Sequence, residues 1–353
     1  MTFNFKVSSQ SGEYEISSNI RGIQDKKNLF VLYDDYFSED LINRLVPKSQ
    51  KISIKISENN KNLSTVDLLI EAMTLAGCNK QTHLVAVGGG ATQDLATLVA
   101  SLYMRGISWS YIPTTLMSML DSCIGGKSSI NVKNYKNILG NFYPPEFIYI
   151  ESNFANTLPK IAIASGLAEA GKICYAKSNE TFNEFLNALK SVSTDLVKYE
   201  KLAEISLTAK KWFIEIDEFD KKERKMLNFG HTFGHALEAA SNFKIPHGIA
   251  ILIGMKVAIN FTGLRIEKLE NFIIEIFNAI KQDVGIISID KNSFKNAISK
   301  DKKNSSMQMF FILPNNNGEL ALVGFEQSTE LLEKCWDSLI YSLKDMDAIY
   351  EVF

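Results

Sequence analysis

Hydrophobic residues in the first half of the chain are grouped into short runs. These runs are "NLFVLYD", "KISIKI", "HLVAVGGG", "SWSYIP" and "FIYIES", and helix-length segments at 38–48, 64–77 and 92–103 lie among them. Such alternation is typical of βαβ units with a mainly parallel sheet. Before them, "FNFKV" and "EYEIS" alternate apolar and polar residues around "SSQSG", which predicts an opening hairpin.

The pattern changes near residue 158. Long amphipathic segments at 158–177, 195–215, 222–242 and 247–263 replace the strand signals, and only "MFFILP" and "ELALVG" around "NNNG" predict a late hairpin. The fold class is therefore expected to be an α/β domain over residues 1–155, followed by a mostly helical domain over residues 156–353.

Composition is that of an ordinary globular protein, with 353 residues, 46% of them hydrophobic and 22% charged. The net charge of −2 favours neither nucleic acid nor an anionic membrane as a partner. "MTFNFKVSSQ" lacks the features of a secretory signal, and no run of about 18 apolar residues occurs. Four widely spaced cysteines suit a reducing compartment, so we expect a cytoplasmic protein with cysteines used for packing.

The strand "HLVAVG" leads through Gly88, Gly89 and Gly90 directly into a predicted helix. Backbone N–H groups at such a turn are free to bind a phosphate, because glycine allows close approach and the helix dipole favours an anion. The spacing GGGxxxD differs from the GxGxxG dinucleotide pattern. A tight turn without a ligand therefore remains the alternative.

Two polar segments, "DSCIGGKSS" and "NVKNYKNILGN", interrupt apolar sequence and place Lys127, Lys133 and Lys136 in loops. Hydroxyls, glycines and ammonium groups are what a phosphate or carboxylate site needs. Because lysine is abundant in this chain, solvated loops are the alternative interpretation.

Histidine is rare, yet three of the four histidines fall within "LNFGHTFGHALEAASNFKIPHGIA". On one continuous helix, Arg224, Asn228, His231 and His235 would share a face. A solvated face should carry Lys or Glu here, but "MLNFGHTFGHAL" has neither. The face is therefore expected to be covered or to line a cleft, where each polar group needs a partner.

A metal ion is one possible partner for these side chains. Histidines at i and i+4, with His247 and an acid from another helix, could complete an open catalytic site. Glu169 in "GLAEAGK" is a candidate acid, because its small neighbours permit close approach of another helix. HxxxH lacks the glutamate of HExxH, which argues against a metalloprotease of that type. Structural histidines with satisfied hydrogen bonds are the alternative.

Several segments occur in one order between about residues 85 and 250: "GGGATQDLATLVASLYMRG", "PTTLMSMLDSCIGGKSSIN", "YKNILGNFYPP", "SGLAEAGK" and "LNFGHTFGHALE" followed by "PHG". Together they resemble the 3-dehydroquinate synthase family of sugar phosphate cyclases. The resemblance implies a dimeric cytoplasmic enzyme with an N-terminal Rossmann-like NAD-binding domain, a C-terminal helical metal-binding domain and an active site in the cleft between them.

The same resemblance implies a reaction. The family converts a seven-carbon keto-acid sugar phosphate, DAHP, to 3-dehydroquinate and phosphate, as a lyase of the shikimate pathway of aromatic amino acid biosynthesis. NAD is used and regenerated, and a divalent ion, usually zinc and in some cases cobalt, holds substrate hydroxyls. The implied metal ligands are Glu169, His231 and His247.

The remaining site residues are also carried over from the family motifs. The implied catalytic and substrate-binding residues are Arg105, Asp121, Lys127, Lys136, Asn137, Lys172, Lys210, Arg224, Asn228 and His235, with either Lys302 or Lys303 near the end of the chain. The implied NAD-binding residues are Asp34, Glu58, Lys61, Gly88, Gly89, Gly90, Ala91, Thr92, Gln93, Asp94, Thr114, Thr115, Lys127, Lys136, Phe154 and Thr157.

Two positions depart from the family pattern. Gln93 stands where the family usually has glycine, and Ile249 stands where it usually has glutamate after "HG". Related cyclases that act on sedoheptulose 7-phosphate, or form amino analogues or deoxy-inosose, are therefore an alternative. Group III NAD- and metal-dependent polyol dehydrogenases are an alternative from another class, but their uncharged substrates need few basic residues. A protein that keeps the fold without catalysis is the last alternative.

Overall fold

The apolar runs of the first half form a seven-stranded sheet in this computed structural model, which describes residues 2–133, 135–190, 197–300 and 308–353. The chain divides into two compact units, Met1–Thr157 with Val192–Glu218, and Leu158–Ser191 with Phe219–Phe353.

The first unit contains most of the strands. Its elements are β1 (Asn4–Ser9), β2 (Gly12–Ser17), α1 (Arg21–Gln24), β3 (Leu29–Asp34), α2 (Glu39–Leu45), β4 (Gln50–Ile54), η1 (Glu58–Asn60), α3 (Leu63–Leu75), β5 (His83–Gly88), α4 (Gly90–Leu102), η2 (Tyr103–Arg105), β6 (Trp109–Pro113), η3 (Ser118–Ser122), β7 (Ile130–Val132), β8 (Tyr135–Leu139), β9 (Phe147–Tyr149), η4 (Ser152–Thr157) and α7 (Val197–Ile216).

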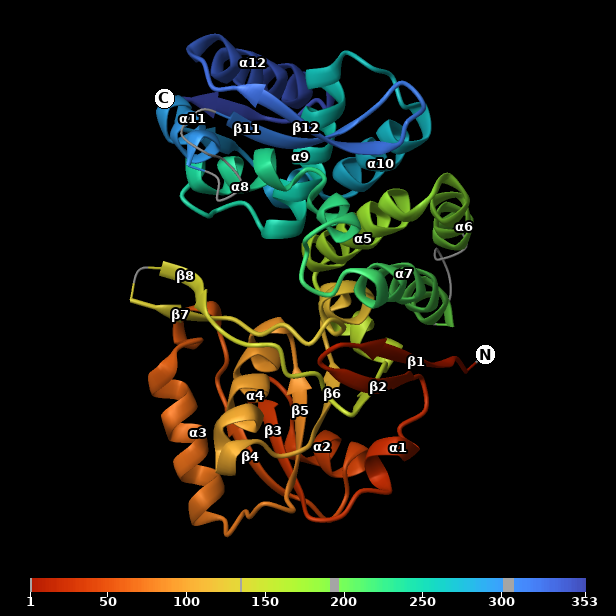
Figure 1. Cartoon of the computed structure of the whole chain (residues 1–353), viewed down its shortest axis with the longest axis vertical. Coiled ribbons are helices and arrows are strands. Elements are labelled where there is room, and N and C mark those ends of the chain that lie inside the picture. The colour runs from red at the N-terminus through yellow and green to blue at the C-terminus, as the bar shows by residue number, and fades with distance from the viewer. Residues whose placement is uncertain (1, 134, 191–196, 301–307) are drawn as a thin grey trace. The chain divides into compact units, whose positions relative to one another are not determined.

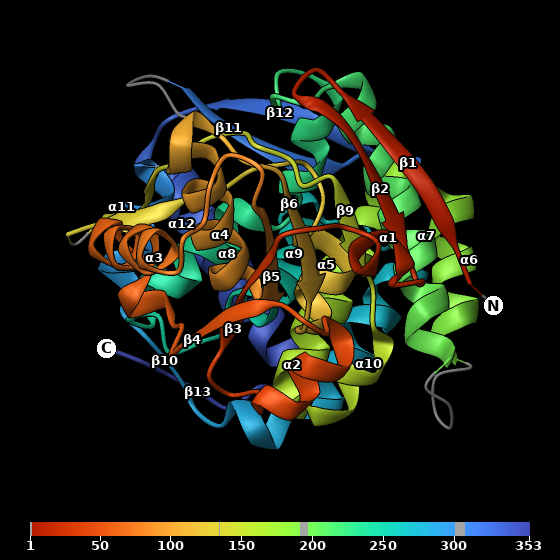
Figure 2. The ribbon, with the colours of Figure 1, turned by 90° about the horizontal axis from the view of Figure 1, so that it is seen from below.

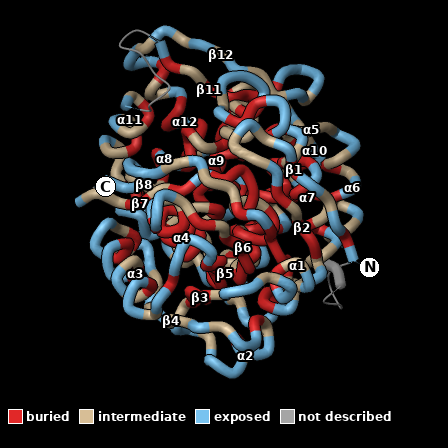
Figure 3. Tube along the Cα trace, turned by 60° about the horizontal axis from the view of Figure 1, so that its bottom comes forward, coloured by how far each residue is buried: buried red, intermediate tan, exposed pale blue. Residues whose placement is uncertain are grey.

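The strand order is β1-β2-β9-β6-β5-β3-β4, with every pairing parallel except that of β1 with β2. The predicted parallel α/β sheet and the predicted opening hairpin are thus confirmed. Figure 1 shows β3, β5 and β6 together, with α3 and α4 beside them. The central strands β5 and β6 are buried along their whole length, as hydrophobic runs of a parallel sheet require (Figure 3).

The second unit is mostly helical. Its elements are α5 (Lys160–Lys177), α6 (Asn179–Lys190), η5 (Glu223–Asn228), α8 (His231–Ala240), α9 (His247–Thr262), α10 (Glu267–Val284), β10 (Ile287–Ile289), α11 (Lys291–Ser299), β11 (Gln308–Pro314), β12 (Leu320–Glu326), α12 (Thr329–Asp345) and β13 (Tyr350–Val352). The late hairpin is confirmed by the antiparallel pairing of β11 with β12.

Helix α9 is the centre of this unit, since it packs against α5, α8, α10, α12 and β11. Nearly all of its side chains are buried, including the ammonium group of Lys256. Lys256 Nζ lies 2.6 Å from Glu270 Oε2 and 2.5 Å from Asp345 Oδ2. These contacts compensate a buried charge that would otherwise be costly.

The structure differs from the sequence prediction in two places. Residues 222–242 do not form one helix, because η5 and α8 are separated at Gly230, whose φ of +76° places it in the left-handed region. Helix α7 lies outside the helical unit, although the prediction placed residues 156–353 in one domain. It packs against β1, η3 and η4 of the first unit, and Figure 2 shows it beside the β1–β2 ribbon.

The short elements were also missed. The hairpin β7–β8 and the parallel pair β10–β13 contain three to five residues per strand and lack a long alternating pattern. All four cysteines are buried, which confirms their predicted role in packing. No helix in the described ranges is both long and apolar enough to span a lipid bilayer.

His83 at the start of β5 is a structural histidine. It is 3% exposed, with Nδ1 2.8 Å from Ser108 Oγ and Nε2 2.7 Å from Ser110 Oγ. Burial lowers the pKa of His83 to about 4, and the nearby Glu146 carboxylate opposes this shift only in part. The imidazole is therefore neutral in the folded protein at pH 7.

We expect His83 to make stability depend on pH. Between pH 6.5 and about 4 the unfolded chain binds a proton at His83 that the folded chain excludes, so stability falls as pH decreases through this window. The full loss at this site is about 3 kcal/mol. Urea unfolding of the wild type and His83→Gln at several pH values measures it. His83→Gln should be less stable than the wild type at pH 7 but should lose less free energy of unfolding on acidification. Equal losses in the two proteins would contradict this role.

Candidate functional site

The glycine turn in the first unit lies where β5 meets α4. Gly89 precedes the first residue of α4, and Thr114 N donates to Gly88 O at 2.9 Å. A Cβ atom at Gly88 would overlap the side chain of Thr92, and one at Gly89 would lie 3.0 Å from Thr115 Cγ2. Glycine is thus required by the close approach of neighbouring groups, which leaves the start of α4 uncovered by side chains from the turn itself.

Thr92 lies in the first turn of α4. Its side chain is fully buried, and its hydroxyl has no hydrogen-bond partner among the described residues. Ala91 is adjacent to it. A helix start with close-packed glycines and an unsatisfied hydroxyl fits the pyrophosphate of a dinucleotide.

Other predicted cofactor residues lie at the same edge of the sheet. Asp34 ends β3, while Thr114 and Thr115 follow β6. Strands β4 and β5 pair with opposite sides of β3, so the strand order reverses there. In open parallel sheets, ligands bind beyond the carboxyl ends of the strands at such a reversal. Phe154 is buried further along the chain against Phe37, with ring centroids 5.2 Å apart, and Thr157 Oγ1 donates to its carbonyl.

Lys61 holds several predicted site residues together. Its side chain is buried, and Nζ lies 2.9 Å from Asp94 Oδ2, 2.7 Å from Asn137 Oδ1 and 3.3 Å from Glu58 Oε1. Ser129 N also donates to Asp94 Oδ1 at 2.9 Å. The buried Lys61 ammonium therefore holds acceptors from separate segments, of which Asp94 is part-buried and Glu58 and Asn137 are exposed.

Asn131 belongs to this network but was missed in the sequence analysis. Its amide nitrogen donates to Glu58 Oε1 at 3.0 Å, and its Oδ1 accepts from Asn137 N at 2.9 Å. It thereby connects η1 with the β7–β8 hairpin. An asparagine in a short strand such as β7 has no distinctive sequence signal, so only its partners reveal this role.

Three predicted basic residues differ from the buried Lys61, and one of them, Lys136, lies in strand β8 and not in the predicted loop. Lys127, Lys136 and Arg105 are all exposed, and Lys127 Nζ lies 5.8 Å from the centroid of the Phe142 ring. Lys136 lines a pocket of about 470 Å³ together with Glu58 and Asn131. The structure thus brings Lys136 near the Lys61 network, whereas Arg105 lies at the end of η2.

Asp121 lies in η3, a single π-helical turn. Its carboxylate is 2.6 Å from Lys210 Nζ, which also donates to the backbone oxygen of Asp121 at 2.8 Å. Lys210 comes from α7, so two segments far apart in sequence meet here within the first unit. π-Helical turns occur frequently at functional sites.

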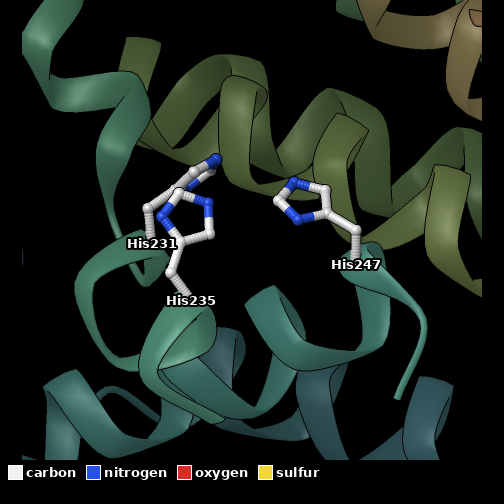
Figure 4. A group of neighbouring side chains, drawn as sticks. All are labelled: His231, His235 and His247. Carbon is white, nitrogen blue, oxygen red and sulfur yellow. The ribbon is translucent and has the colours of Figure 1, made fainter. Parts of the chain in front are cut away.

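In the second unit, His231, His235 and His247 point toward one another (Figure 4). One ligand atom from each lies within 4.8 Å of the others. His231 and His247 are the first residues of α8 and α9, and His235 is one turn along α8. The histidine group is thus formed by two helix starts.

Glycine packing permits this arrangement. A Cβ atom at Gly248 would overlap Ser165 O on α5, one at Gly254 would overlap Gly230 O, and one at Gly234 would lie 2.7 Å from Ile251 Cδ1. Helices α8 and α9 therefore approach closely in the segment that carries the histidines. The glycines in "FGHTFGHA" and "PHG" serve this packing.

Glu169 of α5 faces the histidine group. It is 2% exposed, and its Oε1 lies 3.4 Å from His247 Nε2 and 3.9 Å from His231 Nε2. Its other oxygen forms an ion pair with Lys172, also buried. Oε1 itself has no hydrogen-bond partner in the described parts of the chain. A buried carboxylate oxygen beside imidazole nitrogens fits a divalent metal ion.

The electrostatics of these groups are strongly coupled. Burial alone would raise the pKa of Glu169, but the Lys172 ammonium and the two histidines hold it well below its ordinary value. Burial, reinforced by Lys172, lowers the pKa of His231 well below its usual range. Burial opposes the charged form of His247, but its contacts with Glu169 and Glu238 raise its pKa to about 10. An ionised carboxylate and a neutral His231 are the forms that coordinate metal.

Glu238 provides a carboxylate partner for His247. It lies on α8, and its oxygens are 3.3 Å and 3.4 Å from His247 Nδ1. Ile249, where a glutamate was expected from the resemblance, is fully buried among apolar residues. The departure at 249 therefore does not leave His247 without an acidic neighbour. Such a neighbour orients a ligand ring and fixes its tautomer.

Arg224 and Asn228 lie on η5 and not on the helix of the histidines. Arg224 is 4% exposed, with Nε 3.0 Å from Asp220 Oδ1, and Asn228 Nδ2 donates to Lys225 O. Asp220 and Asn228 line a pocket of about 610 Å³ whose apolar wall comes from Phe310, Ile312 and Leu322. Lys302 and Lys303 lie outside the described residues.

Comparison with known proteins gives a consistent result. Family models for the N-terminal and C-terminal parts of 3-dehydroquinate synthase match residues 51–165 and 166–304. A 3-dehydroquinate synthase of Campylobacter concisus strain 13826 is 35% identical over 286 residues, which cover 80% of this chain and 82% of that protein.

Solved structures show the same fold. A 2-deoxy-scyllo-inosose synthase in complex with carbaglucose-6-phosphate, NAD+ and Co2+ has a TM-score of 0.81 at 23% identity, covering 94% of this chain and 98% of the other. The 2-epi-5-epi-valiolone synthase of Streptomyces hygroscopicus subsp. jinggangensis 5008, solved with NAD+ and Zn2+, has a TM-score of 0.78 at 22% identity, covering 94% and 97%.

Metal analysis of single variants tests the ligand set. We expect His231→Ala to weaken binding of Zn2+ by more than about 100-fold, because the two other ligands cannot close the site, and His235→Ala to retain it. Inductively coupled plasma mass spectrometry of the dialysed protein measures the bound metal, and circular dichroism is the folding control. Equal loss in both variants would instead favour a three-histidine site, and full metal content in His231→Ala would exclude His231 as a ligand.

The carboxylate partner of His247 can be tested separately. Glu238→Gln removes the charge near Nδ1 and is expected to lower Zn2+ affinity by about 10- to 100-fold. Competition with a chromophoric chelator measures the affinity, and Glu275→Gln, at an exposed position on α10, is the matched control. Unchanged affinity in Glu238→Gln would remove Glu238 from the site.

Proposed function

The chain belongs to the 3-dehydroquinate synthase family, and from this premise we propose that it converts DAHP to 3-dehydroquinate and inorganic phosphate. The proposed reaction makes it a carbon–oxygen lyase of the shikimate pathway, acting as a cytoplasmic homodimer. The observation that carries the proposal is the buried Glu169 Oε1, which faces two histidines and has no hydrogen-bond partner in the described ranges.

The metal-binding part of the proposal rests on the second unit. Glu169, His231 and His247 would hold the ion, and Glu238 would orient His247. A bound divalent ion lowers the pKa of coordinated hydroxyl groups and polarises carbonyl groups. One carboxylate and two imidazoles suit zinc and also cobalt. Lys172 keeps Glu169 ionised, and His235 would contact the substrate.

The cofactor-binding part rests on the first unit. The start of α4 after Gly89 would bind the pyrophosphate of NAD, and Asp34 at the end of β3 lies at the neighbouring strand end. Bound NAD would accept a hydride and later return it. The Lys61 network would hold Glu58, Asp94 and Asn137 in place around this cofactor.

The substrate carries both a carboxylate and a phosphate, which need cationic partners when they leave water. Lys127, Lys136 and Arg105 lie at exposed positions of the first unit and would contact such anions. Lys172, Lys210 and Arg224 contact acidic side chains within their own units. These pairs restrict the position of each cation, so little ordering is needed when a substrate arrives.

In the proposed sequence a secondary hydroxyl of the substrate is oxidised to a ketone, which makes the adjacent C–H acidic. That proton is removed, with the substrate phosphate serving as the base, and inorganic phosphate leaves. The ketone is then reduced again, the ring opens, and an aldol step closes the carbocycle. Hydride uptake and return balance, so the sequence consumes no oxidant.

A related sugar phosphate cyclase is the second candidate. Gln93 and Ile249 both depart from the family pattern, and both are buried beside predicted site residues. A polyol dehydrogenase is a weaker candidate, because an uncharged substrate gives no reason for the set of lysine and arginine residues described above. It would also release NADH as a product.

Phosphate and NADH measured in one assay distinguish these functions. We expect the purified protein with NAD, Zn2+ and DAHP to release inorganic phosphate with no net accumulation of NADH. Stoichiometric NADH with glycerol or another polyol would indicate a dehydrogenase. Phosphate release from sedoheptulose 7-phosphate but not from DAHP would replace the proposed substrate, and a protein unfolded by heat is the control.

A further inference from the structure

The π-helical turn η3 ends in three successive backbone carbonyl groups that each accept a hydrogen bond from a side chain. Leu120 O accepts from Ser206 Oγ at 2.7 Å, Asp121 O from Lys210 Nζ at 2.8 Å, and Ser122 O from Gln93 Nε2 at 2.9 Å. Ser206 and Lys210 come from α7, whereas Gln93 comes from α4. The end of η3 is therefore held from two different helices.

These contacts replace bonds that the backbone cannot supply. The last carbonyl groups of a helix have no partner within it, and a buried carbonyl without a partner is costly. Gln93 is 3% exposed, and Ser122 Oγ lies 3.4 Å from its Oε1, so both ends of its amide face Ser122. The Gln93 side chain thus supplies a hydrogen-bond donor to the carbonyl at the end of this turn.

The backbone of Gln93 is equally constrained. Its N–H donates to Gly89 O at 3.1 Å, and its carbonyl accepts from Thr97 Oγ1 at 2.7 Å. Gln93 therefore belongs to the rigid first turn of α4, directly after the glycine turn. Through Ser122 it connects that turn to Asp121, whose other side is held by Lys210.

We propose that Gln93 is a positioning residue that fixes Asp121 relative to the first turn of α4. A glycine at position 93 could not bond Ser122 O, so the end of η3 would lose its side-chain contact with the first turn of α4 and keep those with α7. Gln93 then acts on catalysis through the position of Asp121, without contact with the substrate. The effect on turnover rests on the proposed function, whereas the structural part does not.

Gln93→Met tests both parts, because it keeps the length of the side chain and removes the donor. Hydrogen exchange followed by mass spectrometry should show exchange about 10-fold faster in peptides covering residues 118–123, since one buried hydrogen bond is lost. Gln24→Met is the matched control, because Gln24 Nε2 also donates to a backbone carbonyl, that of Leu45, at an exposed position. Unchanged exchange at residues 118–123 would overturn the proposal.

Kinetics test the effect on Asp121. We expect Gln93→Met to lower kcat by about 10-fold with KM for the sugar phosphate changed less than about 2-fold. In the Asp121→Asn background the same substitution should have little further effect, because both act through one carboxylate. Independent, multiplying effects would overturn the link to Asp121. A wild type that releases no phosphate would instead refute the proposed function, and the exchange experiment would still decide whether Gln93 fixes the turn.

Discussion

Glu169 is buried on α5 with one oxygen paired to Lys172 and the other facing two histidines without a hydrogen-bond partner of its own among the described residues. A carboxylate in this position is costly unless its charge is compensated, and Lys172 compensates only part of it. The second oxygen, which faces His231 and His247, is therefore the candidate ligand atom for a divalent ion. Burial and the Lys172 ammonium lower the pKa of His231 although Glu169 opposes this shift, and Lys172 with the two histidines keeps the pKa of Glu169 low.

Close helix packing makes the arrangement possible. Gly230, Gly234 and Gly254 let α8 and α9 approach, and Gly248 lets the start of α9 reach α5. A side chain at any of these positions would push a ligand residue away from Glu169. In the first unit, Gly88 and Gly89 have the same purpose at the start of α4. Glycine is thus used in both units where a helix start must approach another group.

Buried cations give the two units a second common feature. Lys61, Lys172 and Lys210 each contact an acidic side chain, and each links segments or turns that carry predicted site residues. Breaking one such pair leaves an uncompensated charge, so these pairs resist displacement. The same contacts hold the amides and carboxylates of the site in defined orientations.

Much of the fold was determined by local periodicity. Strands at "HLVAVG" and "SWSYIP" and helices near 38–48, 64–77 and 247–263 are read from patterns in neighbouring residues, and the family motifs identify Glu169, His231 and His247 as a candidate set. The break at Gly230 was not predicted, because the apolar spacing continues through it and only packing against α9 favours the left-handed turn. The place of α7, the pairing of Lys210 with Asp121, and the contacts of Gln93 and Glu238 depend on residues far apart in the chain. The sequence by itself therefore determined which elements form and which chemistry is available, whereas only the tertiary structure decided which charges are paired, because pairing depends on distances between segments that no local pattern encodes.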